Sequence, residues 1–179
     1  MTLYIVRHGL TEENNQQILQ GHLPGILTET GKEQMRKAAD RLVEIDVEYD
    51  CLISSDLRRA LDSAEIIANR LNMSVSPNKL LRERDWGTYT GISVSEAREK
   101  YYKDGMWNFP LTEHPVETEE QLAARAHKAL NELKEQHPNE NIIIVTHGLF
   151  ARFLIAAQCN CDFREVTPLV NAEVRVLGC

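Results

Sequence analysis

The chain has few cysteines, and none of them is arranged as a metal-binding or redox motif. Its 4 cysteines are Cys51, Cys159, Cys161 and Cys179, and no two have Cys-x-x-Cys spacing. This pattern excludes a disulfide framework or a zinc finger as the organising feature. Free thiols favour a cytoplasmic location, and we expect neither a metal ion nor another cofactor.

Long apolar runs and an excess of positive charge are also missing. No stretch reaches the roughly 18 apolar residues of a membrane span, and the amino end lacks the pattern of a signal peptide, so we expect no membrane partner. The 27 acidic residues outnumber the 20 Lys and Arg, which gives a net charge of -7. Nucleic acid is therefore not an expected partner, and an anionic ligand would require a local group of cations.

Glycine and proline are sparse, at 9 and 6 of 179 residues, and they do not concentrate into a linker. We therefore expect one domain over residues 1–179, with a lid or insertion around 84–117. Within this insertion, the aperiodic stretch 104–117 is predicted to be a surface loop. Its aromatic residues, with Tyr102 before it, could either pack the lid or line a pocket. A homodimer remains open.

Strand-like and helix-like segments alternate along the chain. Apolar runs at 3–6, 51–53, 73–76, 142–145 and 172–177 are typical of strands, and amphipathic stretches between them are typical of helices. This alternation predicts an α/β fold, a three-layer sandwich with a mostly parallel central sheet flanked by helices. Helix starts are predicted from the pairs Thr30 with Glu33, Ser93 with Glu96 and Thr118 with Gln121, and from Ser54, Ser55 or Asp56.

Two of the buried strands end in the same way. The runs "LYIV" and "IIIV" are followed by Arg7-His8-Gly9 and by Thr146-His147-Gly148. Ligands bind at the carboxyl ends of the strands in open α/β sheets. If the two strands are neighbours, the imidazoles of His8 and His147 meet at one edge of the sheet.

Cations from a third strand are expected at the same edge. The strand at 51–53 leads into a helix whose first turn carries Arg58 and Arg59. Two or more arginines beside two histidines would form a cationic pocket suited to phosphate oxygens, and Gly9 and Gly148 would allow close backbone approach to the ligand. A metal is disfavoured because the neighbouring cations would repel a third, carboxylate ligand.

Four segments together resemble the signature blocks of the histidine phosphatase superfamily. They are "LYIVRHGLT", "SSDLRRALDSAEII", "LLRERDWGTYTG" and "IIIVTHGLFARFL", in family order across residues 3–154. This superfamily includes cofactor-dependent phosphoglycerate mutases, fructose-2,6-bisphosphatases and α-ribazole phosphatases. The resemblance implies the phosphoglycerate mutase-like fold.

The resemblance also implies a role for each matching residue. His8 would be the nucleophile that becomes phosphohistidine, Arg7, Arg59 and His147 would hold the phosphoryl group, and Glu83 would transfer protons. Arg58, by contrast, is expected to be a solvated residue of the helix. The further expected phosphate or substrate contacts are Asn14, Gln20, Gly21 and Gly148.

The function implied is hydrolysis of a small phosphate monoester, a phosphorylated metabolite. Phosphoglycerate mutase-type phosphoryl transfer is one alternative, but the stretch from Glu83 to His147 is shorter than in such mutases, and within it residues 99–117 have only Lys100, Lys103 and His114 as basic residues. A non-catalytic module that binds phosphate esters is the other alternative. Leu10, Asp62 and Val116 depart from the family pattern without removing a catalytic group, and Leu10 leaves the substrate open.

Overall fold

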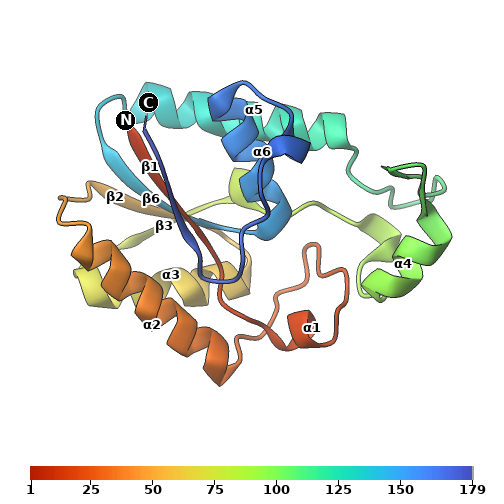
Figure 1. Ribbon diagram of the computed structural model, residues 1–179, viewed down its shortest axis with the longest axis horizontal. Helices are drawn as coiled ribbons and strands as arrows, with labels where there is room; N and C mark the ends of the chain where they lie inside the picture. Colours follow the sequence, from red (N-terminus) through yellow and green to blue (C-terminus); the bar gives the residue numbers. More distant parts are fainter. Residues whose placement is uncertain (179) are drawn as a thin grey trace.

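The central sheet has five strands in the order β3-β2-β6-β1-β7 (Figure 1). The computed structural model describes residues 1–178. Neighbours among β1, β2, β3 and β6 run parallel, whereas β7 pairs antiparallel with β1, so the predicted mostly parallel sheet is confirmed. The strands are β1 (Thr2–Arg7), β2 (Cys51–Ser55), β3 (Val75–Asn78), β6 (Asn141–Thr146) and β7 (Val174–Leu177).

Helices cover both faces of this sheet, which confirms the predicted three layers. In Figure 1, α2 and α3 lie on one side of the strands, and α5 and α6 lie on the other. The remaining helical segments are short and lie in the connections. The bounds are α1 (Glu12–Asn15), α2 (Glu29–Glu44), α3 (Arg58–Leu71), α4 (Val94–Tyr101), α5 (Glu119–Gln136), α6 (Gly148–Cys159) and the 3-10 helices Lys79–Leu81, Gly87–Tyr89 and Phe163–Glu165.

Burial on both faces explains why the strand sequences are apolar without a break. In β1, Leu3 and Ile5 pack into the core beneath α5 and α6, whereas Tyr4 and Val6 pack into the core beneath α2 and α3. Successive side chains of a strand point to opposite faces, so a strand covered on both sides requires apolar residues throughout. Each fully buried side chain of this kind contributes about 1.5–3 kcal/mol.

The strand register brings the two His-Gly segments together. β1 pairs in parallel with β6, with Arg7 opposite Thr146, so His8 and His147 leave the sheet side by side. β2 lies on the other side of β6 and ends at the same edge. The expected meeting of the two histidines therefore follows from adjacent parallel strands.

Two of the predicted helix starts are wrong. The first residue of α2 is Glu29, capped by Thr28, whose side-chain oxygen accepts a hydrogen bond from the Gly31 amide; Thr30 already lies within the first turn. α3 has Leu57 as its N-cap residue, with no side-chain cap. Ser55, expected as a cap, instead ends β2 and directs its hydroxyl to His147 at 2.8 Å.

The other helix starts are confirmed, with one addition. Ser93 caps α4, and Thr118 forms a capping box with Gln121 at the start of α5. A further capping box of Thr11 and Asn14 starts the four-residue α1, which the sequence did not predict because the helix carries no apolar face.

Segment 84–117 extends from the sandwich as a small structured unit. It contains α4 and a hairpin of β4 (Tyr102–Lys103) and β5 (Met106–Trp107), so the predicted loop 104–117 includes a short strand. Asp104 and Gly105 turn the hairpin in left-handed conformations. The rings of Trp107 and Phe109 pack on each other and on Trp86, which lies in the same segment. None of the described helices is long and apolar enough to cross a membrane.

Candidate active site

Two buried histidines lie next to each other at the carboxyl edge of the sheet. The ring centroids of His8 and His147 are 5.1 Å apart, and the side chains are 3% and 0% exposed. The backbone N–H of His8 donates to the Thr146 carbonyl, which continues the β1–β6 ladder past the last strand residue. The position of His8 is therefore fixed by the sheet itself.

The ring of His8 is oriented so that one of its nitrogens carries no proton. Nδ1 lies 2.8 Å from the Gly9 carbonyl oxygen, which can only accept, so Nδ1 carries the proton and Nε2 keeps its lone pair. Burial, together with the charges of Arg59 and Arg7, holds the pKa of His8 well below its ordinary value. A neutral imidazole whose Nε2 carries no proton has the form required of a nucleophile.

Arg59 is the largest fully buried side chain of the protein, at 1% exposure. Its Nε donates to His8 Nε2 at 3.3 Å, and a terminal nitrogen donates to the Gly21 carbonyl at 2.9 Å. Burial lowers the pKa of this guanidinium to about 10, which leaves it charged at neutral pH. Arg58, one residue earlier, points outward and pairs with Asp62, as expected for a solvated position.

Arg7 has a buried donor without a partner. One terminal nitrogen donates to the Leu169 carbonyl at 2.7 Å, whereas Nε is buried and has no partner among the described residues. A Cβ at Gly148 would lie 3.2 Å from this guanidinium, so Gly148 makes room for Arg7. Gly9 packs against the backbone of Gly31, so contacts within the protein account for both glycines, and their close approach to a ligand stays a prediction.

His147 also has an unpaired buried nitrogen. Its Nε2 lies 2.8 Å from the Ser55 hydroxyl, and its Nδ1 has no partner within residues 1–178. Burial and the nearby charge of Arg59 hold the pKa of His147 well below its ordinary value. Buried polar atoms normally find partners, so the free nitrogens of Arg7 and His147 indicate a site built to contact a polar ligand.

Glu83 is held by three backbone N–H groups. Oε1 accepts from Arg84 at 2.9 Å and Phe150 at 3.1 Å, and Oε2 accepts from Leu149 at 3.1 Å. Because α6 has no side-chain cap of its own, the Glu83 carboxylate performs that role from a separate segment. Thr146 holds this segment by donating its hydroxyl to the Leu81 carbonyl at 2.7 Å.

These groups surround a cavity of about 170 Å³. Asn14 uses its side-chain oxygen for Thr11 and Asn171, so its amide nitrogen remains available as a donor. Gly21 has a left-handed φ of 47°, which shapes the loop over the cavity. The expected His147 and Gly148 are not among the lining residues, and Gly148 packs against the Arg7 guanidinium. The lining residues are Arg7, His8, Asn14, Ile18, Leu19, Gln20, Gly21, Arg59, Glu83 and Trp86.

Sequence reasoning missed several residues that position the site. Ser55 holds His147, Ser63 accepts from the Gly9 amide at 3.1 Å, and Asn171 donates to the His8 carbonyl at 3.0 Å. Trp86 forms part of the cavity wall. Ser55, Ser63 and Trp86 lie inside the quoted blocks and could have been found there, whereas Asn171 comes from a distant loop without a local signal.

Potential metal ligands gather at the opposite end of the sheet. Within residues 1–178, Cys51, His137 and Glu140 are the one group of three such side chains with suitable spacing, and Cys51 and Glu140 adjoin the starts of β2 and β6. His137 Nδ1 is 2.8 Å from Glu140, and burial raises the pKa of Cys51 to about 11, so its thiol is protonated. The charges that act on His8 are instead those of Arg59 and Arg7, which are not metal ligands.

Comparison with known proteins identifies the family to which this fold and pocket belong. Residues 3–179 match the histidine phosphatase superfamily (branch 1). The chain therefore belongs to this superfamily, which confirms the resemblance inferred from the four sequence blocks.

Relatives of the chain include both phosphatases and mutase-like proteins. It is 33% identical over 180 residues to phosphoglycerate mutase-like protein 4 of Arabidopsis thaliana, covering 97% of this chain and 77% of that protein. It is 31% identical over 159 residues to a broad-specificity phosphatase of Saccharomyces cerevisiae, covering 86% and 68%. The solved structure of a mycobacterial glucosyl-3-phosphoglycerate phosphatase with VO3 superposes with a TM-score of 0.85 at 26% identity, covering 99% and 90%.

Proposed function

We propose that the protein hydrolyses phosphate monoesters of small metabolites through a phosphohistidine on His8. The observation that carries this proposal is the neutral His8 ring, with Nε2 free of a proton and facing Arg59. Relatives named as phosphatases support the same reaction class. The cavity has room for a phosphoryl group between His8, Arg7 and Asn14.

In the first step, the lone pair of His8 Nε2 forms a bond to phosphorus while the bond from phosphorus to the ester oxygen breaks. The leaving alkoxide takes a proton from Glu83. The products of the step are a free alcohol, phosphorylated His8 and ionised Glu83.

In the second step, water attacks the phosphohistidine. Glu83 accepts a proton from the water as the new oxygen–phosphorus bond forms, and the bond from phosphorus to Nε2 breaks. Inorganic phosphate leaves, and His8 and Glu83 return to their starting forms. No other reactant is needed.

Arg7, Arg59 and His147 stabilise the transferred group in both steps. Arg7 Nε and His147 Nδ1 are buried nitrogens without a hydrogen-bond partner among residues 1–178, and they would interact with the charge that develops on the phosphoryl oxygens. Stabilisation by charges already in position is the main source of catalysis in phosphoryl transfer.

The pocket favours hydrolysis over mutase chemistry. A mutase must also hold the carboxylate of its substrate, which requires cations beyond those that bind the phosphoryl group. The cations lining the cavity are Arg7 and Arg59, both beside His8. Of the basic residues in segment 99–117, Lys100 pairs with Glu96 on the surface.

The same proposal includes the organisation and location of the chain. Residues 1–179 form one domain, and segment 84–117 acts as a lid that contributes Trp86 to the cavity wall. The unpaired thiols of Cys51, Cys159 and Cys161 support a cytoplasmic location.

The test is the substitution His8→Ala, with His127→Ala on the exposed face of α5 as the matched control. We expect the wild type and His127→Ala to hydrolyse an aryl phosphate and to form an acid-labile phosphoryl label. His8→Ala should lose both properties. A label that persists in His8→Ala would refute the assignment, and wild-type protein that binds phosphate without any turnover would favour the non-catalytic binding module.

A further inference from the structure

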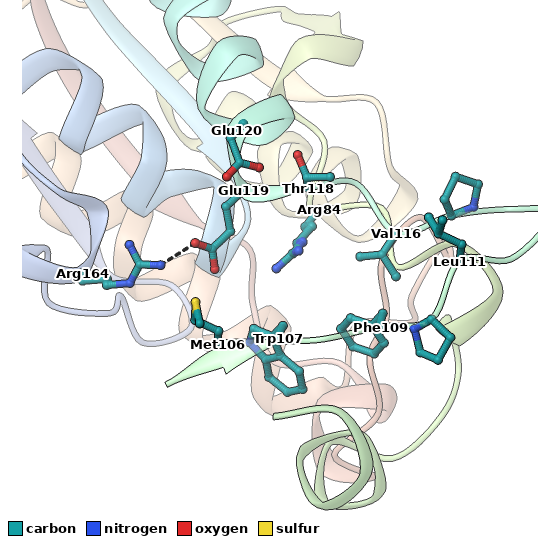
Figure 2. Close-up of a pocket in the computed structure, with 12 residues that line it drawn as sticks. Arg84, Met106, Trp107, Phe109, Leu111, Val116, Thr118, Glu119, Glu120 and Arg164 are labelled. Carbon is teal, nitrogen blue, oxygen red and sulfur yellow. Dashed lines mark hydrogen bonds and ion pairs between the residues drawn. The ribbon is translucent and has the colours of Figure 1, made fainter. Parts of the chain in front are cut away.

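A second, larger cavity lies between segment 84–117 and the start of α5. Its volume is about 320 Å³, within the usual range for small-molecule sites. Figure 2 shows Arg84 pointing into the middle of this cavity, with Trp107 and Phe109 on one side and Glu119 on the other. The proposed chemistry of His8 makes no use of this space.

Arg84 is a buried cation with unused donors. Its side chain is 5% exposed, its Nε donates to the Glu117 carbonyl at 2.7 Å, and its guanidinium stacks over Trp86 at 4.6 Å. Within residues 1–178, neither terminal nitrogen has a hydrogen-bond partner or an ion pair within 4.0 Å. A buried guanidinium that keeps two donors free at the wall of a cavity is a ready anion site.

The remaining walls determine which anion the cavity can take. Trp107 and Phe109 stack in parallel, with centroids 5.3 Å apart and planes at 8°, and give this side of the cavity an apolar, aromatic lining. Across the cavity, Glu119 is neutralised by Arg164 at 2.5 Å, and Glu120 is a second carboxylate close by. The lining carries two cations, Arg84 and Arg164, and two carboxylates, which both act on Arg84, so a doubly charged phosphate would be repelled more strongly than a single negative charge.

We propose that this cavity binds a small monocarboxylate with a planar apolar body. The two terminal nitrogens of Arg84 match the two oxygens of a carboxylate. The apolar body of the ligand would lie against Trp107 and Phe109. The proposal concerns a site that does not depend on the reaction at His8.

The cavity is separate from the one that contains His8, although the two are close. They share no lining residue, and Glu83 and Arg84 are successive residues that line different cavities. Trp86 stands between them, since it lines the first cavity and stacks on Arg84 of the second. Occupancy of either cavity can therefore be measured without displacing a ligand from the other.

The first experiment measures binding of phenylacetate by calorimetry, with phenylacetamide and phenylphosphonate as probes of charge. We expect saturable binding of phenylacetate, with phenylacetamide and phenylphosphonate at least about fivefold weaker. Saturating vanadate should leave the phenylacetate affinity unchanged. Displacement by vanadate would place the probe in the first cavity, and equal binding of the three probes would mean that Arg84 does not select a monocarboxylate; either result overturns the proposal.

Variants then test the location of the probe. Met106 is 57% exposed at the rim of the cavity, so its replacement should leave the fold intact. Met106→Glu should weaken phenylacetate binding about fivefold and Met106→Lys should strengthen it, because each adds a charge near Arg84. Arg84→Met should abolish binding, with circular dichroism as the check of folding. If the two Met106 variants bind alike, the proposal is wrong.

Discussion

Replacing Glu83 by Gln separates its proposed chemical role from its role in the fold. The substitution removes the transferable proton but keeps the size of the side chain. The carboxylate accepts three backbone N–H bonds, and an amide nitrogen cannot accept any of them. We therefore expect a loss of stability as well as a loss of activity, and the two effects must be measured separately.

The structure sets the size of each effect. Turning the amide nitrogen toward Leu149 leaves one backbone N–H without its acceptor, at a cost of about 1–3 kcal/mol. For a chain of this length, this corresponds to a fall in melting temperature of roughly 2–4 °C per kcal/mol. The loss of proton transfer should slow dephosphorylation of an alkyl ester by about 10²–10⁴-fold.

The assay is rapid-mixing kinetics on two esters that differ in their leaving group. In a sugar phosphate the leaving group is the sugar alkoxide, which is strongly basic and needs the proton. In a nitrophenyl phosphate the leaving group is nitrophenolate, which departs without a proton. Glu83→Gln should therefore keep a burst of nitrophenol while its steady-state rate falls, because the second step still requires a base. The matched control is Asp62→Asn, which removes a carboxylate from the surface pair with Arg58. Equal slowing of both bursts in Glu83→Gln would show that Glu83 is not the acid.

Three further outcomes are expected. The pKa values of His8 and His147 are lowered by burial, so the folded state binds fewer protons than the unfolded chain. The contribution of these rings to the unfolding free energy should be complete above about pH 6.5 and fall below it, by at most about 1.4 kcal/mol per pH unit for each ring. In His8→Asn, the unfolding free energy measured by urea denaturation should fall less steeply as the pH is lowered. Gly9→Ala would place a Cβ 2.5 Å from the Gly31 carbonyl oxygen, and the resulting overpacking should cost about 1–3 kcal/mol in the same assay. Vanadate should inhibit turnover and chelators should not, because arginines supply the positive charge; activity that is lost on chelation and restored by a divalent ion would contradict this.

The sequence predicted the parts of the site that depend on strand order and residue type. His8 and His147 follow unbroken apolar runs, and such runs indicate parallel strands whose carboxyl ends share an edge. The order of residues in the second block identified Arg59, and not Arg58, as the expected phosphate ligand. In the structure Arg59 is buried, whereas Arg58 pairs with Asp62 at the surface.

The sequence could not predict contacts that depend on packing between distant segments. Gly9 and Gly148 both follow a histidine, and their pattern alone gave no sign that one packs against Gly31 and the other against Arg7. The serine cap predicted for α3 failed because the helix begins at Arg58 with Leu57 as its N-cap residue. Ser55 lies in the strand, where its hydroxyl accepts from the Leu57 N–H at 3.3 Å and lies 2.8 Å from His147 Nε2, a contact between distant segments that local propensity does not contain.

The buried Arg59 has a consequence for how substrate preference can change. It holds the loop beside the cavity through the carbonyls of Gly21 and Leu23, and every amino acid supplies a carbonyl. The side chains of Gln20 and Leu23 can therefore be exchanged while the backbone path is retained. Gly21 and Gly25 are the exceptions, because both have a left-handed φ, and a Cβ would lie 3.0 Å from Thr90 Oγ1 at Gly21 and 2.8 Å from Arg59 Cδ at Gly25. A library that randomises the loop and keeps these two glycines would search new substrates on an unchanged anchor.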